Sequence, residues 1–332
     1  MVDLTIRLIV TLFISFHLNS LEFSVMTLNA DNLFDTKDDL KKDDKAFLPI
    51  ELKKSNKHKE SCLRIKVKSW RDECLFLDWN ESIKNYKLSN IVSSITSYEI
   101  NGPDILALQE IENLNILNQL LTLLKPYGYI DAKLLEGDDF RGIDTAVISK
   151  FNIVDARLHK ISFKGKYKNK KTRPILDITL DVFDNKIKIY NIHFPSGFND
   201  VSMRIDSLNT LNKLLLTHDL PSIALGDFNI NSKEDKSFNL YKYQEDLWNV
   251  AHISGCNFCK GTYFYNNDKT WQFLDSIFLS KNRGMSYVTG SIKIHTNNFN
   301  SFPNTGKPKI FNTINKEGVS DHLPMVAKIK LN

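Results

Sequence analysis

The sequence predicts an α/β protein built as a mixed-sheet sandwich covered by helices. Short apolar runs, typical of buried strands, alternate with amphipathic helical patterns in the first half of the chain. In the second half, strand-like segments follow one another as hairpins. No linker-like stretch divides the 332 residues, so we expect one large folded domain.

The first half of the chain contains two predicted strands and two predicted helices. Residues 21–30 alternate between apolar and polar side chains, and residues 104–110 form a buried-type run with a polar end. Leucine, isoleucine and valine recur at helical spacing over residues 88–98, which an Asn-Gly-Pro turn terminates. A second amphipathic helix is predicted over residues 114–124, before a proline.

The second half contains one further predicted helix, over residues 203–216, among six strands. Two of these strands are joined by Phe183-Asp184-Asn185, which we expect to be a hairpin turn. The predicted strands cover residues 145–149, 175–182, 186–194, 223–229, 273–279 and 325–331.

The start of the chain has the pattern of a signal peptide, which we place at residues 1–20. Residues 8–18 are mostly apolar and follow Arg7, and this length is too short to span a bilayer. Asp3 and the poor cleavage site before residue 21 leave a buried first strand as the alternative. No later segment predicts a transmembrane helix. We expect an exported protein, periplasmic or extracellular, or a cytoplasmic one if this segment is not cleaved.

The four cysteines form two pairs that are close in sequence, Cys62 with Cys74 and Cys256 with Cys259. An even number in an exported chain suggests local disulfides. A zinc site made of all four thiolates is an alternative, as are four reduced thiols in the cytoplasm.

The composition is that of an ordinary globular protein, with 42% hydrophobic and 25% charged residues. Its net charge of +5 is compatible with an anionic substrate, although a lysine-rich surface alone gives the same value. A segment at about residues 36–87 is rich in lysine and aspartate and has little periodicity, so we interpret it as an insertion. Its lysines either follow a polyanion or form a solvated face.

Polar side chains follow almost every predicted strand. Taken one at a time, each is explained as a cap, a turn or a satisfied polar group. Burying so many without partners would cost a few kcal/mol each, so a shared function is the simpler interpretation. These residues are Asn29, Gln109, Glu110, Asp144, His193, Asp227, Asn229, Asp275, Ser320, Asp321 and His322.

The polar residues at the strand ends resemble those of the endonuclease/exonuclease/phosphatase superfamily, typified by deoxyribonuclease I. The resemblance implies a four-layer sandwich of two mixed β-sheets flanked by helices. It also implies divalent-metal-dependent hydrolysis of a phosphoester at one edge of the sheets. The matching fragments occur in the family's order: Thr27-Leu-Asn29, Gln109-Glu110, Arg141-Gly-Ile-Asp144, Asn191-Ile-His193, Gly226-Asp-Phe-Asn229, Phe273-Leu-Asp275 and Ser320-Asp-His322.

The resemblance, together with the oxygen chemistry of hard cations, gives the metal-binding expectations. We expect Glu110 to bind Mg²⁺, with Mn²⁺ or Ca²⁺ as alternatives, helped by Asn29 and Asp321. Asp227 and Asn229 are expected to orient the nucleophilic water. A second ion bound by this pair is the alternative to a single metal ion.

The catalytic expectations concern two histidines. His322, oriented by Asp275, is expected to take the water's proton or to stabilise charge on the phosphate as a cation. His193 is expected to donate to the phosphate or leaving oxygen, with Asp144 as its carboxylate partner. Arg141 is either a phosphate clamp or a solvated loop residue.

The expected function is a secreted or periplasmic nuclease that cleaves DNA, monomeric and without a stable protein partner. The Arg141-Gly-Ile-Asp144 variant resembles secreted bacterial nucleases of this superfamily. A phospholipid or small-molecule phosphodiesterase, similar to sphingomyelinases, is the alternative; its aromatic hairpin would be Tyr263-Phe264-Tyr265. A binding module without turnover is the third possibility.

Overall fold

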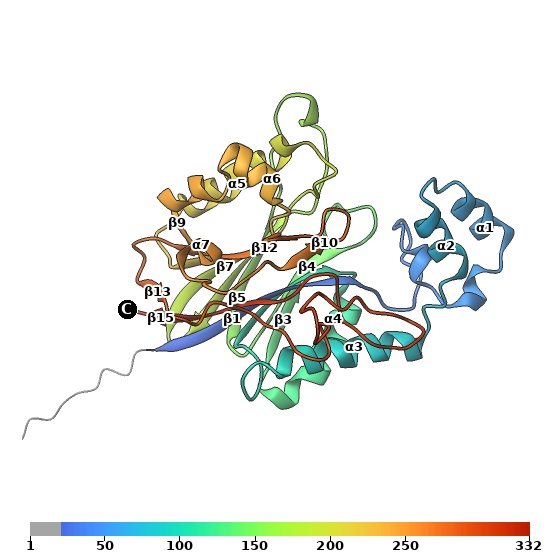
Figure 1. The fold of residues 1–332 in the computed structure, drawn as a ribbon, viewed down its shortest axis with the longest axis horizontal. Helices are drawn as coiled ribbons and strands as arrows, with labels where there is room; N and C mark the ends of the chain where they lie inside the picture. The colour runs from blue at the N-terminus through green and yellow to red at the C-terminus, as the bar shows by residue number, and fades with distance from the viewer. Residues whose placement is uncertain (1–20) are drawn as a thin grey trace, which may run out of the picture.

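Two β-sheets pack face to face between layers of helices in the computed structural model, which describes residues 21–332 (Figure 1). The segment expected to be a signal peptide, residues 1–20, lies outside the described residues. The strand order in the first sheet is β13-β15-β1-β2-β4-β3, with β14 beside β15. These strands are β1 (Glu22–Leu33), β2 (Ile105–Ile111), β3 (Asp131–Leu134), β4 (Asp144–Ser149), β13 (Met285–Tyr287), β14 (Lys293–Ile294) and β15 (Met325–Leu331).

The second sheet has the order β5-β6-β7-β8-β12-β9, and a separate two-stranded ribbon joins β10 to β11. Phe183 and Asp184 both have positive φ in the tight turn between β6 and β7, which confirms the predicted hairpin. The strands are β5 (Asn152–His159), β6 (Ile175–Val182), β7 (Asn185–His193), β8 (Ser222–Asp227), β9 (Trp248–Val250), β10 (Tyr263–Tyr265), β11 (Thr270–Gln272) and β12 (Asp275–Ser280).

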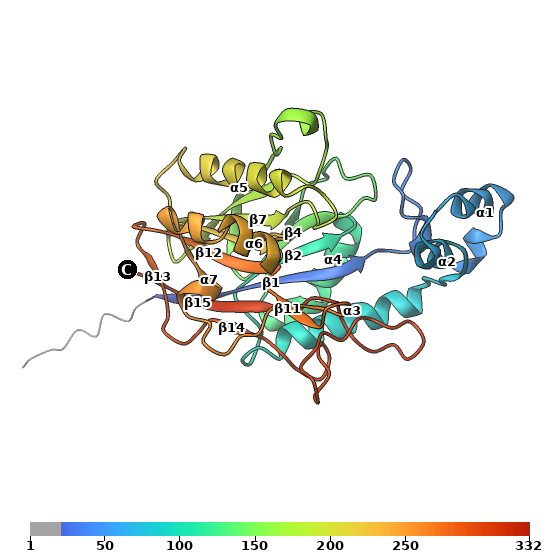
Figure 2. The ribbon, with the colours of Figure 1, turned by 45° about the horizontal axis from the view of Figure 1, so that its top comes forward.

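Helices cover the outer face of each sheet, α3 and α4 on the first and α5 on the second (Figures 1 and 2). The α-helices are α1 (Asn56–Leu63), α2 (Lys68–Phe76), α3 (Glu81–Thr96), α4 (Leu114–Leu124), α5 (Val201–Leu215), α6 (Ser232–Phe238) and α7 (Ala251–Ser254). Short 3₁₀ turns cover Lys45–Phe47, Ile50–Lys53, Lys125–Tyr127, Gly165–Tyr167 and Lys242–Asp246.

The apolar residues of β2 show why its sequence is a continuous apolar run. Ile105 and Ala107 face the other sheet in the central core, whereas Leu106 and Leu108 face α3 and α4 in the outer core. Side chains alternate between the two faces of a strand, so a strand buried on both faces needs apolar residues throughout. The predicted four-layer fold is confirmed.

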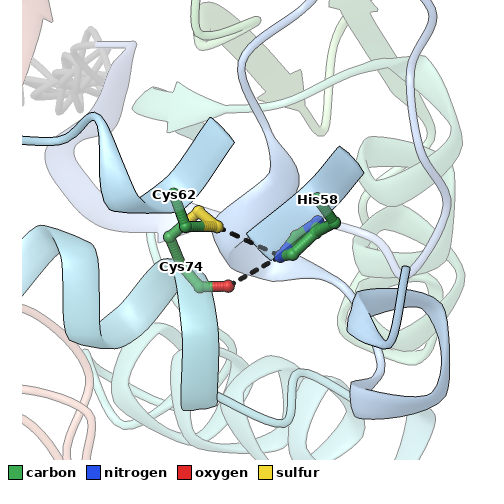
Figure 3. Close-up of side chains that lie close together, drawn as sticks. All are labelled: His58, Cys62 and Cys74. Carbon is green, nitrogen blue, oxygen red and sulfur yellow. Dashed lines mark hydrogen bonds between the residues drawn. A yellow bond between two sulfur atoms is a disulfide. The ribbon is translucent and has the colours of Figure 1, made fainter. Parts of the chain in front are cut away.

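Residues 45–77, which we call the arm, extend from the end of the sandwich at which β1 terminates (Figures 1 and 2). A disulfide between Cys62 and Cys74 joins α1 to α2. Figure 3 shows His58 beside it, with Nε2 3.2 Å from Cys62 Sγ and 2.9 Å from the Cys74 carbonyl oxygen. The expected insertion ends earlier than residue 87, because α3 starts at Glu81 behind the capping side chain of Asn80.

The second disulfide joins Cys256 to Cys259, just after α7. Since all four sulfur atoms are engaged in two local disulfides, the alternative of a four-thiolate zinc site is not realised. Over residues 21–332, every helix is too short or too polar to cross a bilayer.

Candidate active site

The strand ends carry the polar residues to one edge shared by both sheets. β1 runs parallel to β2, with Asn29 opposite Gln109, and β7 runs parallel to β8, with His193 opposite Asp227. β12 is antiparallel to β8 and begins with Asp275 opposite Asp227. The Asn29 amide donates to Asp227 Oδ2 at 3.2 Å, which joins the two sheets at this edge. Parallel strands therefore end, and antiparallel strands start, at one place.

Glu110 owes its orientation to irregular backbone. It has a φ of 62° and lies where the pairing of β2 with both neighbours shifts register. Such bulges redirect a side chain relative to a regular strand. Glu110 Oε2 accepts from the backbone N–H of Asn32 at 3.0 Å, and Oε1 accepts from the Asn29 amide at 3.4 Å. The carboxylate is thus held against the end of β1.

Lys87, from α3, supports the bulge on the β1 side. Its ammonium donates to the carbonyl oxygens of Asp31 and Asn32, both of which have positive φ. It lies over the rings of Trp79 and Phe311. Burial lowers the pKa of Lys87, although negative charges at the site oppose this shift. The sequence analysis did not identify this residue.

Asp227 lies at the centre of the cluster and is held by amides. Its Oδ1 accepts from the Asn229 N–H at 2.8 Å, and its Oδ2 accepts from the Asn229 side chain at 2.9 Å. Burial raises the pKa of Asp227 to about 7, although the nearby His322 opposes the shift. His193 Nε2 lies 3.6 Å from Asp227 Oδ2 and 3.7 Å from Glu110 Oε1.

Gly226 permits the close approach of β7 and β8 just before Asp227. Its φ is 142°, and a Cβ at this position would lie 2.0 Å from the Ile192 carbonyl oxygen. No larger residue fits without displacing β7, and with it His193. This explains the glycine in the Gly-Asp-Phe-Asn fragment.

His322 and Asp275 form a buried pair. Asp275 Oδ2 lies 2.7 Å from His322 Nδ1, and the ring of Tyr263 packs against the imidazole at 5.1 Å between centroids. Burial by itself would lower the pKa of His322, but the surrounding carboxylates, Asp275 foremost, hold that pKa well above its usual value. These carboxylates therefore favour the protonated form of His322.

Asp321 lies on the open side of the cluster, with Oδ1 3.9 Å from His322 Nε2 and its side chain 35% exposed. Burial and the negative charge of Asp31 raise the pKa of Asp321 to about 7. The edge thus combines closely spaced carboxylates with one imidazolium.

A second buried cation lies behind His193. Arg173 donates to the carbonyl oxygens of His193 and Phe194, at 3.3 and 3.1 Å, and to Asp139 Oδ2 at 2.9 Å. Arg141 lies on the other side of Asp139, its Nε 3.5 Å from Oδ1, with 40% of its side chain exposed. Burial, followed by the charges of Arg173 and Arg141, lowers the pKa of His193 well below its usual value. Burial and these two guanidinium groups therefore favour the neutral form of His193.

Asp144 and His193, the expected pair, share no hydrogen bond among the described residues. Asp144 Oδ1 accepts from the Gly137 N–H at 3.0 Å, whereas its Oδ2 and His193 Nδ1 are buried without a hydrogen-bond partner among residues 21–332. The carboxylates near His193 are instead Glu110 and Asp227. Asp144 starts β4 in the first sheet, and its carboxylate turns toward the loop at Gly137. Burial raises the pKa of Asp144 to about 7.

The donor set fits a hard divalent cation. Carboxylate oxygens of Asp227 and Asp275 lie within 4.8 Å of each other, and Glu110 adds its carboxylate beside them. The Asn29 amide nitrogen links Glu110 to Asp227, while the Asn29 oxygen accepts from the Asp31 N–H. Asp275 Oδ1 is buried without a hydrogen-bond partner in the described part of the chain. Unneutralised carboxylates and an unpaired buried oxygen are what a bound cation would stabilise.

Several solved structures have a similar fold. An endonuclease/exonuclease/phosphatase family protein from Bacteroides thetaiotaomicron is 15% identical, with a TM-score of 0.59 over 94% of this chain and 99% of that chain. A family protein from Leptotrichia buccalis is 18% identical, with a TM-score of 0.53 over 92% and 99%. A humanized TDP2 from D. rerio is 13% identical, with a TM-score of 0.57 over 93% and 98%.

A search of curated protein sequences gave no match. The model of the endonuclease/exonuclease/phosphatase family matches residues 79–314, which is more than two thirds of the chain. Asn29, Asp321 and His322 lie beyond that range, and the fold brings them to the same edge. The chain belongs to the endonuclease/exonuclease/phosphatase family.

Proposed function

We propose that this protein is a divalent-metal-dependent phosphodiesterase that cleaves DNA. Its family supplies the coarser activity, phosphoester hydrolysis. The observation that carries the proposal is the buried cluster of Asp227, Asp275 and His322 next to Glu110 and Asn29. The net charge of +5 suits a polyanionic substrate.

We propose that Glu110 and Asp321 hold the cation, with Mg²⁺ the expected ion and Mn²⁺ or Ca²⁺ as alternatives. Asn29, expected as a third ligand, donates its amide N–H to Glu110 and so positions that carboxylate. When bound, such an ion polarises a phosphoryl oxygen and offsets charge that develops during hydrolysis. The carbonyl contacts of Lys87 keep Asn32, and through it Glu110, in place for this role.

We assign the other catalytic roles to Asp227, His322, His193 and Arg141. Asp227, fixed by both donors of Asn229, orients a water and accepts its proton, since a pKa of about 7 suits a general base. The carboxylates around His322, Asp275 foremost, favour its protonated form, so we assign it charge stabilisation on the phosphate and not the role of base. We assign His193, whose neutral form is favoured by burial, a hydrogen bond to the phosphate, and we assign the half-exposed Arg141 the role of a phosphate clamp.

The alternative substrate, a phospholipid, would call for a free aromatic hairpin. The β10–β11 ribbon is a hairpin, but Tyr263 packs on His322 and Phe264 packs on Trp271. These rings are engaged with the protein, which favours a nucleic acid over a bilayer.

We further propose that the mature protein acts as a monomer outside the cytoplasm. Two local disulfides support this, because such bonds persist in oxidising compartments. Comparing the N-terminal sequence of periplasmic and cytoplasmic fractions after expression tests the proposed cleavage after residue 20; an intact N-terminus in both fractions contradicts it.

The decisive experiment compares plasmid DNA, RNA, sphingomyelin liposomes and a chromogenic phosphodiester, with and without chelator. We expect DNA cleavage that chelator abolishes, and a loss of about 100-fold or more for Glu110→Gln and His322→Gln. Glu51→Gln, on the exposed arm, is the matched control. Hydrolysis that survives chelator or Glu110→Gln contradicts the proposal, and cleavage of liposomes in preference to DNA identifies the alternative.

A further inference from the structure

A groove of about 340 Å³ opens beside the proposed active site. Asp321 lines it at the catalytic side, and Tyr263 lines it while packing on His322. The opposite wall comes from the segment between β14 and β15, whose residues 301 and 308 are bridged. A molecule held with its reactive phosphate at the cluster would therefore extend into this groove.

The groove presents the exposed ring of Phe302, with the Lys309 ammonium 5.9 Å from its centroid, and a second lysine, Lys307. Phe302 has 47% of its surface exposed at the wall. The Lys307 ammonium lies 3.8 Å from the Phe264 ring centroid and forms no ion pair with any described residue. Lys309, by contrast, is paired with Glu317 at 2.8 Å. Lys307 is thus the cation that remains available to an anionic ligand.

Amide side chains complete the wall. Asn312 and Asn315 use their side-chain oxygens to accept backbone N–H groups of their own turn, from Ile314 at 2.9 Å and Glu317 at 3.2 Å respectively. Their amide nitrogens find no acceptor within residues 21–332. They are left to donate to a ligand in the groove.

These groups are the ones that recognise an unstacked nucleotide. The base stacks on an aromatic ring, the phosphate pairs with an ammonium group, and the edge of the base accepts hydrogen bonds from side-chain amides. The volume is at the lower end of small-molecule sites, which suits one nucleotide. A base paired within a helix cannot present its face to a ring.

We propose that this groove binds one unpaired nucleotide next to the scissile phosphate, with its base on Phe302 and a phosphate at Lys307. The preferred substrate is then single-stranded or frayed nucleic acid and not an intact duplex. This inference rests on the proposed nuclease function and specifies its substrate.

The test uses Phe302→Ala and Lys307→Ala, with Phe299→Ala and Lys293→Ala as controls at exposed positions outside the groove. Each variant is assayed on a single-stranded oligonucleotide, on its blunt duplex and on the chromogenic phosphodiester. We expect Phe302→Ala to raise KM for the single strand about tenfold, as base stacking is lost. Hydrolysis of the chromogenic ester, which has no base, should change less than about twofold.

Binding to the single strand in chelator, followed by fluorescence anisotropy, gives a second measurement. Lys307→Ala should reduce the slope of log affinity against log salt by about 0.7, the value for one phosphate contact on a single strand. Groove variants that behave as their controls, or a wild type that prefers the blunt duplex, overturn the groove proposal alone. A wild type that hydrolyses the chromogenic ester but no nucleic acid overturns the proposed function and the groove proposal together.

Discussion

Arg173 provides the sharpest test of how the site is supported. Its side chain is buried and makes three hydrogen bonds, two to the carbonyls of His193 and Phe194 and one to Asp139. Arg173→Met removes the cation and leaves a buried carboxylate and two carbonyl groups without this donor. Breaking a buried ion pair in this way costs about 3–5 kcal/mol. Because Arg141 remains 3.5 Å from Asp139, we expect the lower end, about 3 kcal/mol.

The measurement is a urea and thermal unfolding series. At about 2 °C per kcal/mol for a chain of this size, Arg173→Met should lower Tm by roughly 6 °C. Arg173→Lys keeps a charge near Asp139 but loses the two carbonyl contacts, so it should cost about 1–2 kcal/mol. In the double variant with Asp139→Asn, the buried charge is gone, and the two effects should fall short of additivity by about 2 kcal/mol. A coupling energy near zero, or Arg173→Met within about 0.5 kcal/mol of wild type, would refute the reasoning.

Three further predictions address the site, the pH dependence and the arm. Lys87→Met removes the donor to the Asp31 carbonyl. In a steady-state assay kcat should fall about tenfold, and thermal melting should show a loss of about 1–3 kcal/mol in the free energy of unfolding. An unchanged kcat contradicts this prediction. Burial lowers the pKa of His252 to about 4, so as the pH falls the unfolded state takes up this proton before the folded state does. The free energy of unfolding of the wild type should therefore fall by up to about 3 kcal/mol between pH 6.5 and pH 4. His252→Phe should remove this part of the fall in urea titrations at each pH, and identical curves for the two proteins argue against it. Cys62→Ser combined with Cys74→Ser removes the disulfide, which closes a loop of 12-residue separation and should stabilise the arm by about 3 kcal/mol. Proteolysis should then cut the arm first while ester hydrolysis persists. Simultaneous loss of the intact arm and of ester hydrolysis would show that the arm is part of the core.

The sequence predicted strands best where both faces are buried. The predicted bounds of residues 175–182 and 325–331 agree with β6 and β15, because apolar side chains mark both ends. β5 was missed, since this edge strand alternates half-buried and exposed residues and resembles a loop. The start of α3 was placed late because Lys84 and Lys87, which interrupt the apolar pattern, are buried.

The sequence predicts the strand ends that form the candidate site and the pairing of His322 with Asp275, but not the partners of Glu110 and His193. Adjacent parallel strands bring Asn29 and Glu110 together by topology alone. The bulge that directs Glu110 depends on a hydrogen bond from Asn32, 78 positions away, which no local pattern reveals. The sequence does not single out Arg173 for a similar reason: it follows five exposed lysines within residues 164–171 and, unlike them, is buried.

Side-chain hydrogen bonds cross from one sheet to the other beside the catalytic edge. The Asn29 amide donates to Asp227, and the Gln109 amide donates to the Asn191 side-chain oxygen at 2.7 Å. Each half of the molecule therefore carries an incomplete set of reactive groups. A slip of one layer past the other by a single residue would disconnect them while leaving every strand paired within its own layer. Turnover is thus a sensitive gauge of interlayer alignment, and it should vanish on gentle heating before circular dichroism reports any loss of secondary structure.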